Sequence, residues 1–101
     1  MIDFLEPWQS VGDERRHRLE TELVRELAPS HELSGKRVRA IAARCDCDDV
    51  LFEVPGLGYA VVHLTWSRQH ESSPDWPATR LFLSLVDWAE RCMRPDHEQL
   101  S

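Results

Sequence analysis

The apolar positions between Gly12 and Ala28 recur at the spacing of one face of an α-helix. They are Leu19, Leu23, Val24 and Leu27. Charged residues fill the remaining positions, and either Ser10 or Asp13 can cap the first turn. We therefore predict a helix over residues 12–28, which Pro29 ends because the residue before a proline disfavours helical backbone.

Shorter apolar runs follow the helix and alternate with polar turns, which is typical of β-strands. The runs cover residues 36–44, 49–54 and 59–66. They are rich in Val, Ile, Leu and aromatic residues, and their short connections permit only antiparallel pairing. We predict a three-stranded meander whose third strand is the most buried. A loop over Ser67–Thr79 then leads to a short fourth strand at Arg80–Leu83.

A second helix is predicted near the end of the chain. Ser84 precedes Asp87 by three residues, an arrangement that resembles a capping box, and an apolar stretch follows. We expect this helix to run to about Arg94, where Pro95 ends it, and residues 95–101 to form a flexible tail.

The order of these elements favours the α+β class. The predicted architecture is an N-terminal helix, a three- to four-stranded antiparallel meander and a C-terminal helix, with the helices mainly on one sheet face. With 101 residues, the chain suffices for a single domain over 1–101 with its own core. Residues 1–11, which carry Phe4 and Trp8 around Pro7, are predicted to form an extended arm packed on that domain.

The charge balance narrows the classes of partner. The chain carries 12 Lys and Arg residues against 18 Asp and Glu residues, a formal net charge of -6. Such a chain lacks the positive field that binds phosphate backbones, so we expect no nucleic-acid partner. The sequence has no long apolar run, and its start lacks the basic and apolar stretches of a secretion signal. We therefore expect a cytoplasmic protein without membrane association.

The alternation of the second and third strands suggests a histidine flanked by acids. Joining their apolar faces requires a connection of odd length or a bulge at Pro55-Gly56-Leu57-Gly58, which the glycines permit. If Phe52 lies opposite Val62, Leu51 lies opposite His63 on the other face of the sheet. Two carboxylates are then diagonal to this histidine, those of Asp49 and Glu53.

This second sheet face is the predicted binding surface. Its candidate residues, with one aromatic from the loop, are Leu51, Glu53, Tyr59, Val61, His63, Thr65 and Trp76. A surface of mixed apolar and polar character favours a non-enzymatic module that meets a protein partner or a second copy of itself as a homodimer. The alternative is a small-ligand binder or an enzyme that uses His63. The sequence favours binding, because catalysis also needs a pocket and an attacking group, and we assign no catalytic residue.

The turn Cys45-Asp46-Cys47-Asp48-Asp49 gathers two thiols and three carboxylates. Together with His63 it could hold a metal, but a single Cys-x-Cys does not supply the four ligands of a zinc site. A polar hairpin turn, whose Asp side chains bond to nearby backbone amides, is the commoner use of such residues. We therefore predict free thiols and no metal or cofactor.

Two further groups of side chains have alternative interpretations. Trp8 and Trp76 lie in irregular segments, where they are either lids over the edges of the core or anchors for a partner, and burial of large apolar residues favours lids. The Arg-rich start of the first helix is interpreted as a solvated face, on which Arg18 and Glu22 can pair one turn apart.

A further pattern runs through the predicted meander and the loop after it. It consists of Asp48-Asp49-Val50-Leu51-Phe52, Ala60-Val61-Val62-His63-Leu64-Thr65-Trp66 and Trp76-Pro77, with a weaker extension to Pro7-Trp8. In these residues the chain resembles a group of short bacterial hypothetical proteins with no assigned function. The resemblance implies a compact bacterial domain and transfers no functional residue.

Overall fold

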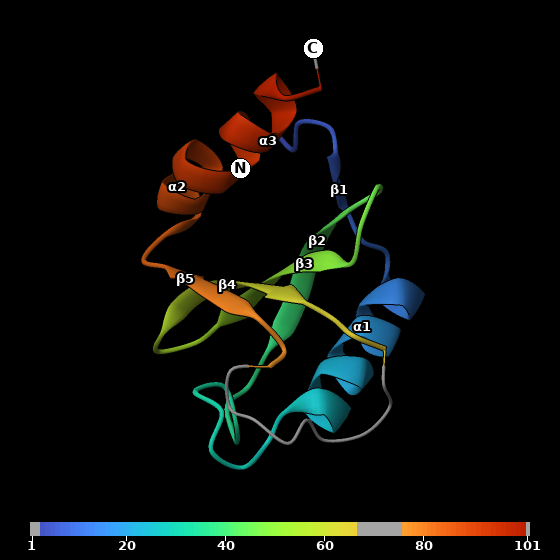
Figure 1. Cartoon of the computed structure of the whole chain (residues 1–101), viewed down its shortest axis with the longest axis vertical. Coiled ribbons are helices and arrows are strands. Elements are labelled where there is room, and N and C mark those ends of the chain that lie inside the picture. Colours follow the sequence, from blue (N-terminus) through green and yellow to red (C-terminus); the bar gives the residue numbers. More distant parts are fainter. Residues whose placement is uncertain (1–2, 67–75, 101) are drawn as a thin grey trace.

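The computed structural model describes residues 3–66 and 76–100. Within these residues the chain forms a five-stranded antiparallel sheet in the order β1-β2-β3-β4-β5, with helices packed against it (Figure 1). The strands are β1 (Trp8–Ser10), β2 (Arg39–Arg44), β3 (Asp49–Val54), β4 (Gly58–His63) and β5 (Thr79–Phe82). The helices are α1 (Asp13–Glu26), α2 (Leu85–Trp88), η1 (Ala89–Met93), which is a π-helical turn, and α3 (Arg94–Glu98). The predicted α+β class is confirmed.

The hairpin between β3 and β4 aligns the apolar residues of the two strands. Val54 pairs with Gly58, so the connection Pro55-Gly56-Leu57 has the predicted odd length. Gly58 has a φ of 119°, and a Cβ atom there would lie 2.4 Å from the carbonyl oxygen of Phe82. Glycine is therefore required at this position, because a side chain would collide with the start of the β5–α2 connection.

One face of the sheet packs against α1. Buried leucines of this helix contact the apolar residues that β3 and β4 present to the same side. The members of this first core are Leu19, Leu23, Leu27, Leu33, Ala40, Ala43, Val50, Phe52, Val54, Ala60, Val62 and Leu64. This agrees with the predicted apolar face for Leu19, Leu23 and Leu27, whereas Val24, also predicted on that face, is 58% exposed. The helix ends at Glu26, before the predicted residue Ala28.

The opposite face packs against the C-terminal helical run formed by α2, η1 and α3. Trp88 is fully buried there, and its ring meets that of Trp8 edge-on with centroids 5.1 Å apart. A second core surrounds this pair, made of Trp8, Ala42, Leu51, Val61, Phe82, Trp88, Ala89, Cys92 and Met93. The helices therefore cover both faces and not mainly one, because the second face is also apolar and must be removed from water.

The terminal segments form regular secondary structure within residues 3–66 and 76–100. The arm 1–11 ends in β1, where Trp8 pairs with Arg44 at an edge of the sheet. The predicted tail 95–101 begins inside a helix, since α3 runs from Arg94 to Glu98.

Pro95 does not end the C-terminal helix because a π-helical turn precedes it. In that turn the amide of Arg94 donates to the carbonyl of Ala89, five residues back. The shifted hydrogen bonds bring Pro95 into a first-turn position of α3, where the missing amide of a proline is tolerated.

The predicted loop Ser67–Thr79 lies outside the described residues up to Asp75, together with His70 and Glu71. Among the residues that the structure does describe, no helix is both long enough and apolar enough to cross a lipid bilayer.

Candidate functional site

The face predicted as the open binding surface is part of the second core. Leu51 is 0% exposed and Val61 is 4% exposed, and both lie beneath the C-terminal helical run. The prediction of a surface role is wrong for these two residues. Tyr59 packs at the margin of the same core and is half-buried.

The register of β3 and β4 also differs from the predicted one. His63 lies opposite Asp49, and Leu51 lies opposite Val61, because the tight hairpin closes at Val54 and Gly58. The Nδ1 atom of His63 is 2.7 Å from Oδ1 of Asp49. The second predicted acid, Glu53, lies opposite Tyr59 at the far end of the hairpin. His63 therefore faces one of the two predicted carboxylates across the strands.

Two of the predicted surface residues are exposed. Thr65 lies just beyond β4, where its amide donates to Oε1 of Glu26 at 2.9 Å. Trp76 is also exposed, whereas Trp8 is buried in the second core and donates from Nε1 to Asp96. The lid interpretation is confirmed for Trp8, and Trp76 remains open to solvent.

The cysteine-rich turn is a polar hairpin turn stabilised by an ion pair. Arg44 donates from Nε and Nη2 to the two carboxylate oxygens of Asp46, each at 2.8 Å, which lowers the pKa of Asp46. Cys45 and Cys47 are free and exposed. Across residues 3–66 and 76–100, no three or more His, Cys, Asp or Glu side chains are arranged so that they could hold a metal ion.

The strand β5 lies at an edge of the sheet, and among the described strands it pairs with β4 alone. The amide of His63 donates to the carbonyl of Ala78 at 2.9 Å, so Ala78 and Arg80 turn their backbone groups toward β4. By the same alternation, the backbone amides and carbonyls of Thr79 and Leu81 point away from the sheet. These groups are placed to pair with a further strand.

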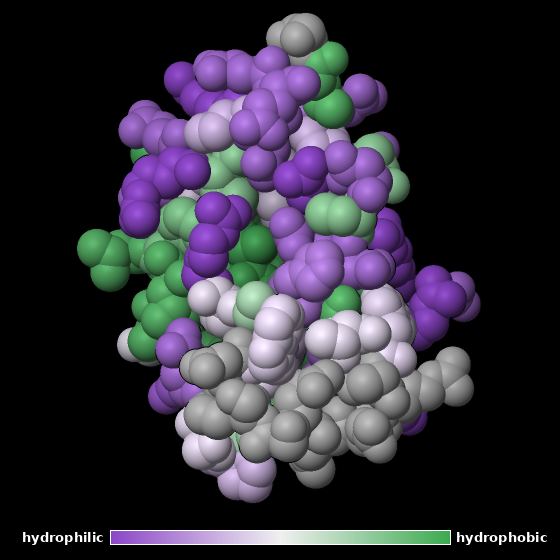
Figure 2. All heavy atoms as spheres, viewed as in Figure 1, coloured by the Kyte–Doolittle hydropathy of each residue, from purple (hydrophilic) through white to green (hydrophobic). Residues whose placement is uncertain are grey.

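Apolar side chains gather on this edge. Leu81 is 39% exposed, Leu83 is 88% exposed and Val86 is 63% exposed. Figure 2 shows hydrophobic residues on the left side of the molecule, over β5 and its connection to α2. Large apolar residues that cluster on a surface mark interaction sites, whereas single ones are ordinary. We call Leu81, Leu83 and Val86 the β5 patch.

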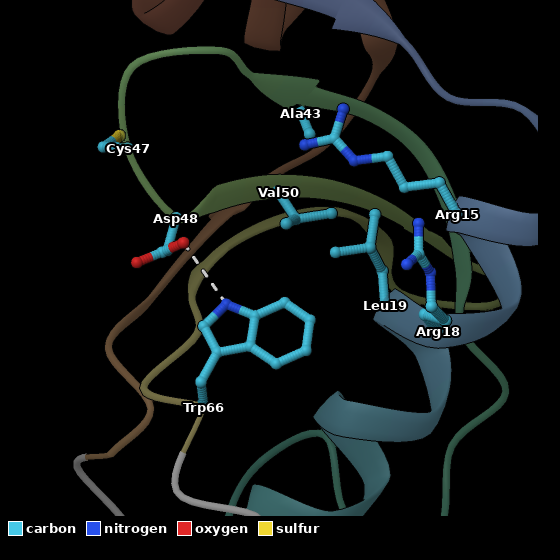
Figure 3. Close-up of a pocket in the computed structure, with 8 residues that line it drawn as sticks. All are labelled: Arg15, Arg18, Leu19, Ala43, Cys47, Asp48, Val50 and Trp66. Atoms are coloured by element: carbon cyan, nitrogen blue, oxygen red, sulfur yellow. Dashed lines mark hydrogen bonds between the residues drawn. The ribbon is translucent and has the colours of Figure 1, made fainter.

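A cavity of about 340 Å³ lies at the other end of the sheet, between α1, the β2–β3 turn and Trp66 (Figure 3). Leu19, Ala43 and Val50 form its apolar floor. The side chains of Arg15 and Arg18 come from α1, and Trp66 stands opposite them in the close-up.

Buried carboxyl groups hold the chain beside this cavity. Arg15 and Arg18 are exposed, as predicted for the Arg-rich start of α1, but Glu22 and Glu26 are 2% and 0% exposed, so Glu22 does not belong to that solvated face. Glu26 accepts from the amides of Thr65 and Trp66 at 2.9 and 2.8 Å. Burial and the neighbouring Glu22 carboxyl raise the pKa of Glu26 to about 7.

Sequence reasoning missed both surfaces for identifiable reasons. Leu81 and Leu83 alternate with Arg80 and Phe82, a pattern that a buried strand also shows. The cavity depends on residues far apart in the chain, Arg15, Arg18 and Trp66. The signal in the sequence was the Arg-rich start of the helix, which we interpreted as a solvated face. Comparison with protein-family models, curated proteins and solved structures found no match to the chain.

Proposed function

We propose that this protein is a non-enzymatic interaction module and that the β5 edge, with the β5 patch, pairs with a second copy of the chain. The observation that carries the proposal is a sheet edge with outward backbone groups at Thr79 and Leu81 beside three exposed apolar side chains. Edge strands with such groups are templates for pairing, and natural proteins usually protect them with charges or prolines. The one charged residue of β5, Arg80, donates from its guanidinium to Sγ of Cys92, and the side chain of Leu81 is exposed at this edge.

A second copy is favoured as the occupant because an antiparallel strand can pair with itself about a two-fold axis. If the axis passes between the two Leu81 residues, each Thr79 faces Leu83 of the other copy. The apolar side chains then lie side by side across the interface. The alternative register, with the axis at Arg80, would place two guanidinium groups opposite each other and is disfavoured.

Catalysis by His63 receives less support. The sheet face on which catalysis would need a substrate cavity carries the C-terminal helical run and buries Leu51 and Val61. His63 is held by Asp49 at the end of this face, an arrangement that ordinary structural ion pairs also produce. We also propose a cytoplasmic location, because Cys45 and Cys47 are exposed free thiols, which are typical of reducing compartments.

Analytical ultracentrifugation over a range of protein concentrations tests the pairing. We expect the wild-type chain to dimerise as its concentration rises, with the modest affinity typical of a small interface. Leu83→Glu places a charge in the patch and should leave a monomer at every concentration. Leu83 is 88% exposed, so this substitution should leave the fold intact.

Val24→Glu is the matched control, because Val24 is an exposed apolar residue on α1, away from β5. This variant should dimerise like the wild type. A wild-type chain that stays monomeric at millimolar concentration would contradict the proposal. So would an equal loss of dimer in the Val24→Glu and Leu83→Glu variants.

A further inference from the structure

We propose that the cavity beside Trp66 binds a small organic anion with a flat apolar body, of the aromatic carboxylate class. Its volume of about 340 Å³ falls at the lower end of the range for small-molecule sites. The cavity combines an apolar floor, a cationic side and an indole ring, and each part recognises a different part of such a ligand. The proposal is separate from the function proposed for β5, whose residues do not line this cavity.

The cationic side comes from two arginines that have no acidic partner in the described part of the chain. Arg15 and Arg18 are three residues apart on α1 and so lie on the same side of the helix. Their neighbour Arg16 forms an ion pair with Asp13. In a chain with a net charge of -6, two guanidinium groups that meet no carboxylate among residues 3–66 and 76–100 lie beside one cavity and favour an anionic ligand.

Trp66 is held in an uncommon backbone conformation by hydrogen bonds from its amide and its indole. It has a φ of 57°, a left-handed conformation that is uncommon for a bulky residue. The carboxylate of Glu26 accepts from its amide at 2.8 Å, and its indole Nε1 donates to Oδ1 of Asp48 at 3.2 Å. These contacts fix the ring at the mouth of the cavity while leaving it 44% exposed, so its surface is available to a ligand.

The arrangement of charge determines how the ligand lies. In the close-up, the guanidinium groups and the Asp48 carboxylate stand on opposite sides of the apolar floor (Figure 3). A carboxylate ligand would be repelled by Asp48 and attracted to the arginines. Its ring would then lie over Val50 and Leu19, beside the indole of Trp66. Inorganic phosphate would engage the arginines and leave the apolar floor and the indole unused.

Benzoate is the probe that tests this site, by NMR titration of the ¹⁵N-labelled chain. The signal to follow is the indole N–H of Trp66, identified by its loss in Trp66→Phe. We expect a saturable shift with benzoate, and binding of the uncharged benzamide to be weaker by about tenfold or more. Arg15→Gln and Arg18→Gln should each weaken benzoate binding by roughly tenfold.

Arg94→Gln is the control, since Arg94 is an exposed arginine on α3 outside the cavity. Its affinity for benzoate should equal that of the wild type. Both cavity arginines are exposed, and unchanged signals elsewhere in each spectrum will show that the variants are folded. The proposal is overturned if benzamide binds as well as benzoate, if phosphate binds as tightly, if Arg94→Gln has the same effect, or if millimolar benzoate gives no saturable shift.

Discussion

Glu26 is the residue on which the position of Trp66 depends. Its carboxylate lies inside the protein without a cationic partner among the described contacts, and it accepts two backbone amides from the segment after β4. Those amides favour the charged form, whereas burial and the Glu22 carboxyl favour the neutral form and have the larger effect. The residue therefore titrates close to neutral pH.

This titration predicts how stability depends on pH. The pKa of Glu26 is about 7 in the folded chain, above the ordinary value of 4.5 that applies to the unfolded chain, so the folded state holds its proton more tightly. The contribution of Glu26 to the free energy of unfolding is complete below pH 4.5, decreases as the pH rises, and is lost above pH 7. The decrease amounts to about 3 kcal/mol. Urea unfolding at pH values across this interval measures it.

Glu22→Gln should reduce the decrease in the free energy of unfolding that occurs as the pH rises. An amide at position 22 can donate a hydrogen bond to the ionised Glu26 and carries no competing charge, so the pKa of Glu26 should fall. Glu14→Gln, an exposed change on the same helix, should leave the decrease as it is in the wild type. If Glu22→Gln shows the full wild-type decrease, the pairing of the two carboxyl groups does not control the titration.

At the scale of elements, the C-terminal helical run is joined to the far edge of the sheet by Asp96. One oxygen of this carboxylate, Oδ2, accepts from Nε1 of Trp8 at 2.9 Å and lies 3.3 Å from Nη1 of Arg44. The contact therefore links α3 to β1 and β2. It explains why a segment with the sequence of a flexible tail is ordered as a helix.

Asp96→Ala should destabilise the chain by about 1 to 3 kcal/mol, because it leaves the ring nitrogen of buried Trp8 without its acceptor. Urea denaturation followed by tryptophan fluorescence gives the free energy of unfolding. Glu90→Ala changes an exposed acid on the same helical run and should have an effect within about 0.5 kcal/mol. Equal effects of the two substitutions would show that Asp96 does not join these elements.

The sequence was sufficient for elements whose pattern is local. The leucines of α1, the odd connection at Pro55-Gly56-Leu57 and the capping of α2 by Ser84 all follow from neighbouring residues. Ser84 accepts from the amide of Asp87, as its spacing predicted. Local patterns of this kind can be recognised in the sequence because helix and strand periods repeat over a few residues.

What the sequence did not reveal depends on contacts between distant segments. The role of Trp8 requires contacts with Trp88 and Asp96, which lie near the opposite end of the sequence. The predicted pairing of His63 with Leu51 was wrong by two residues, since His63 pairs with Asp49. Alternation of apolar and polar residues shows which face of the sheet a side chain is on, but it does not show which residue lies opposite on the next strand. The two candidate sites also depend on contacts between distant segments, because both the cavity and the exposed β5 edge form only when the sheet is assembled.

At the scale of the whole molecule, the net negative charge of the chain affects both proposed sites. Added salt should strengthen self-association through β5 and weaken benzoate binding in the cavity. Each copy carries a formal charge of -6, so two copies repel one another while the β5 patch attracts them. Salt screens the repulsion and leaves apolar contact and backbone pairing largely unaffected. Self-association should therefore strengthen as sodium chloride rises from about 0.05 to 0.3 M.

Benzoate binding should weaken over the same range of salt, because its attraction to Arg15 and Arg18 is an exposed electrostatic contact that ions screen. Ultracentrifugation and the NMR titration, performed in the same series of buffers, measure both trends on one preparation. A dimer that dissociates as salt rises would mean that ion pairs, and not the β5 patch, hold the copies together. Benzoate affinity that is independent of salt would mean that the ring binds without its carboxylate reaching the arginines.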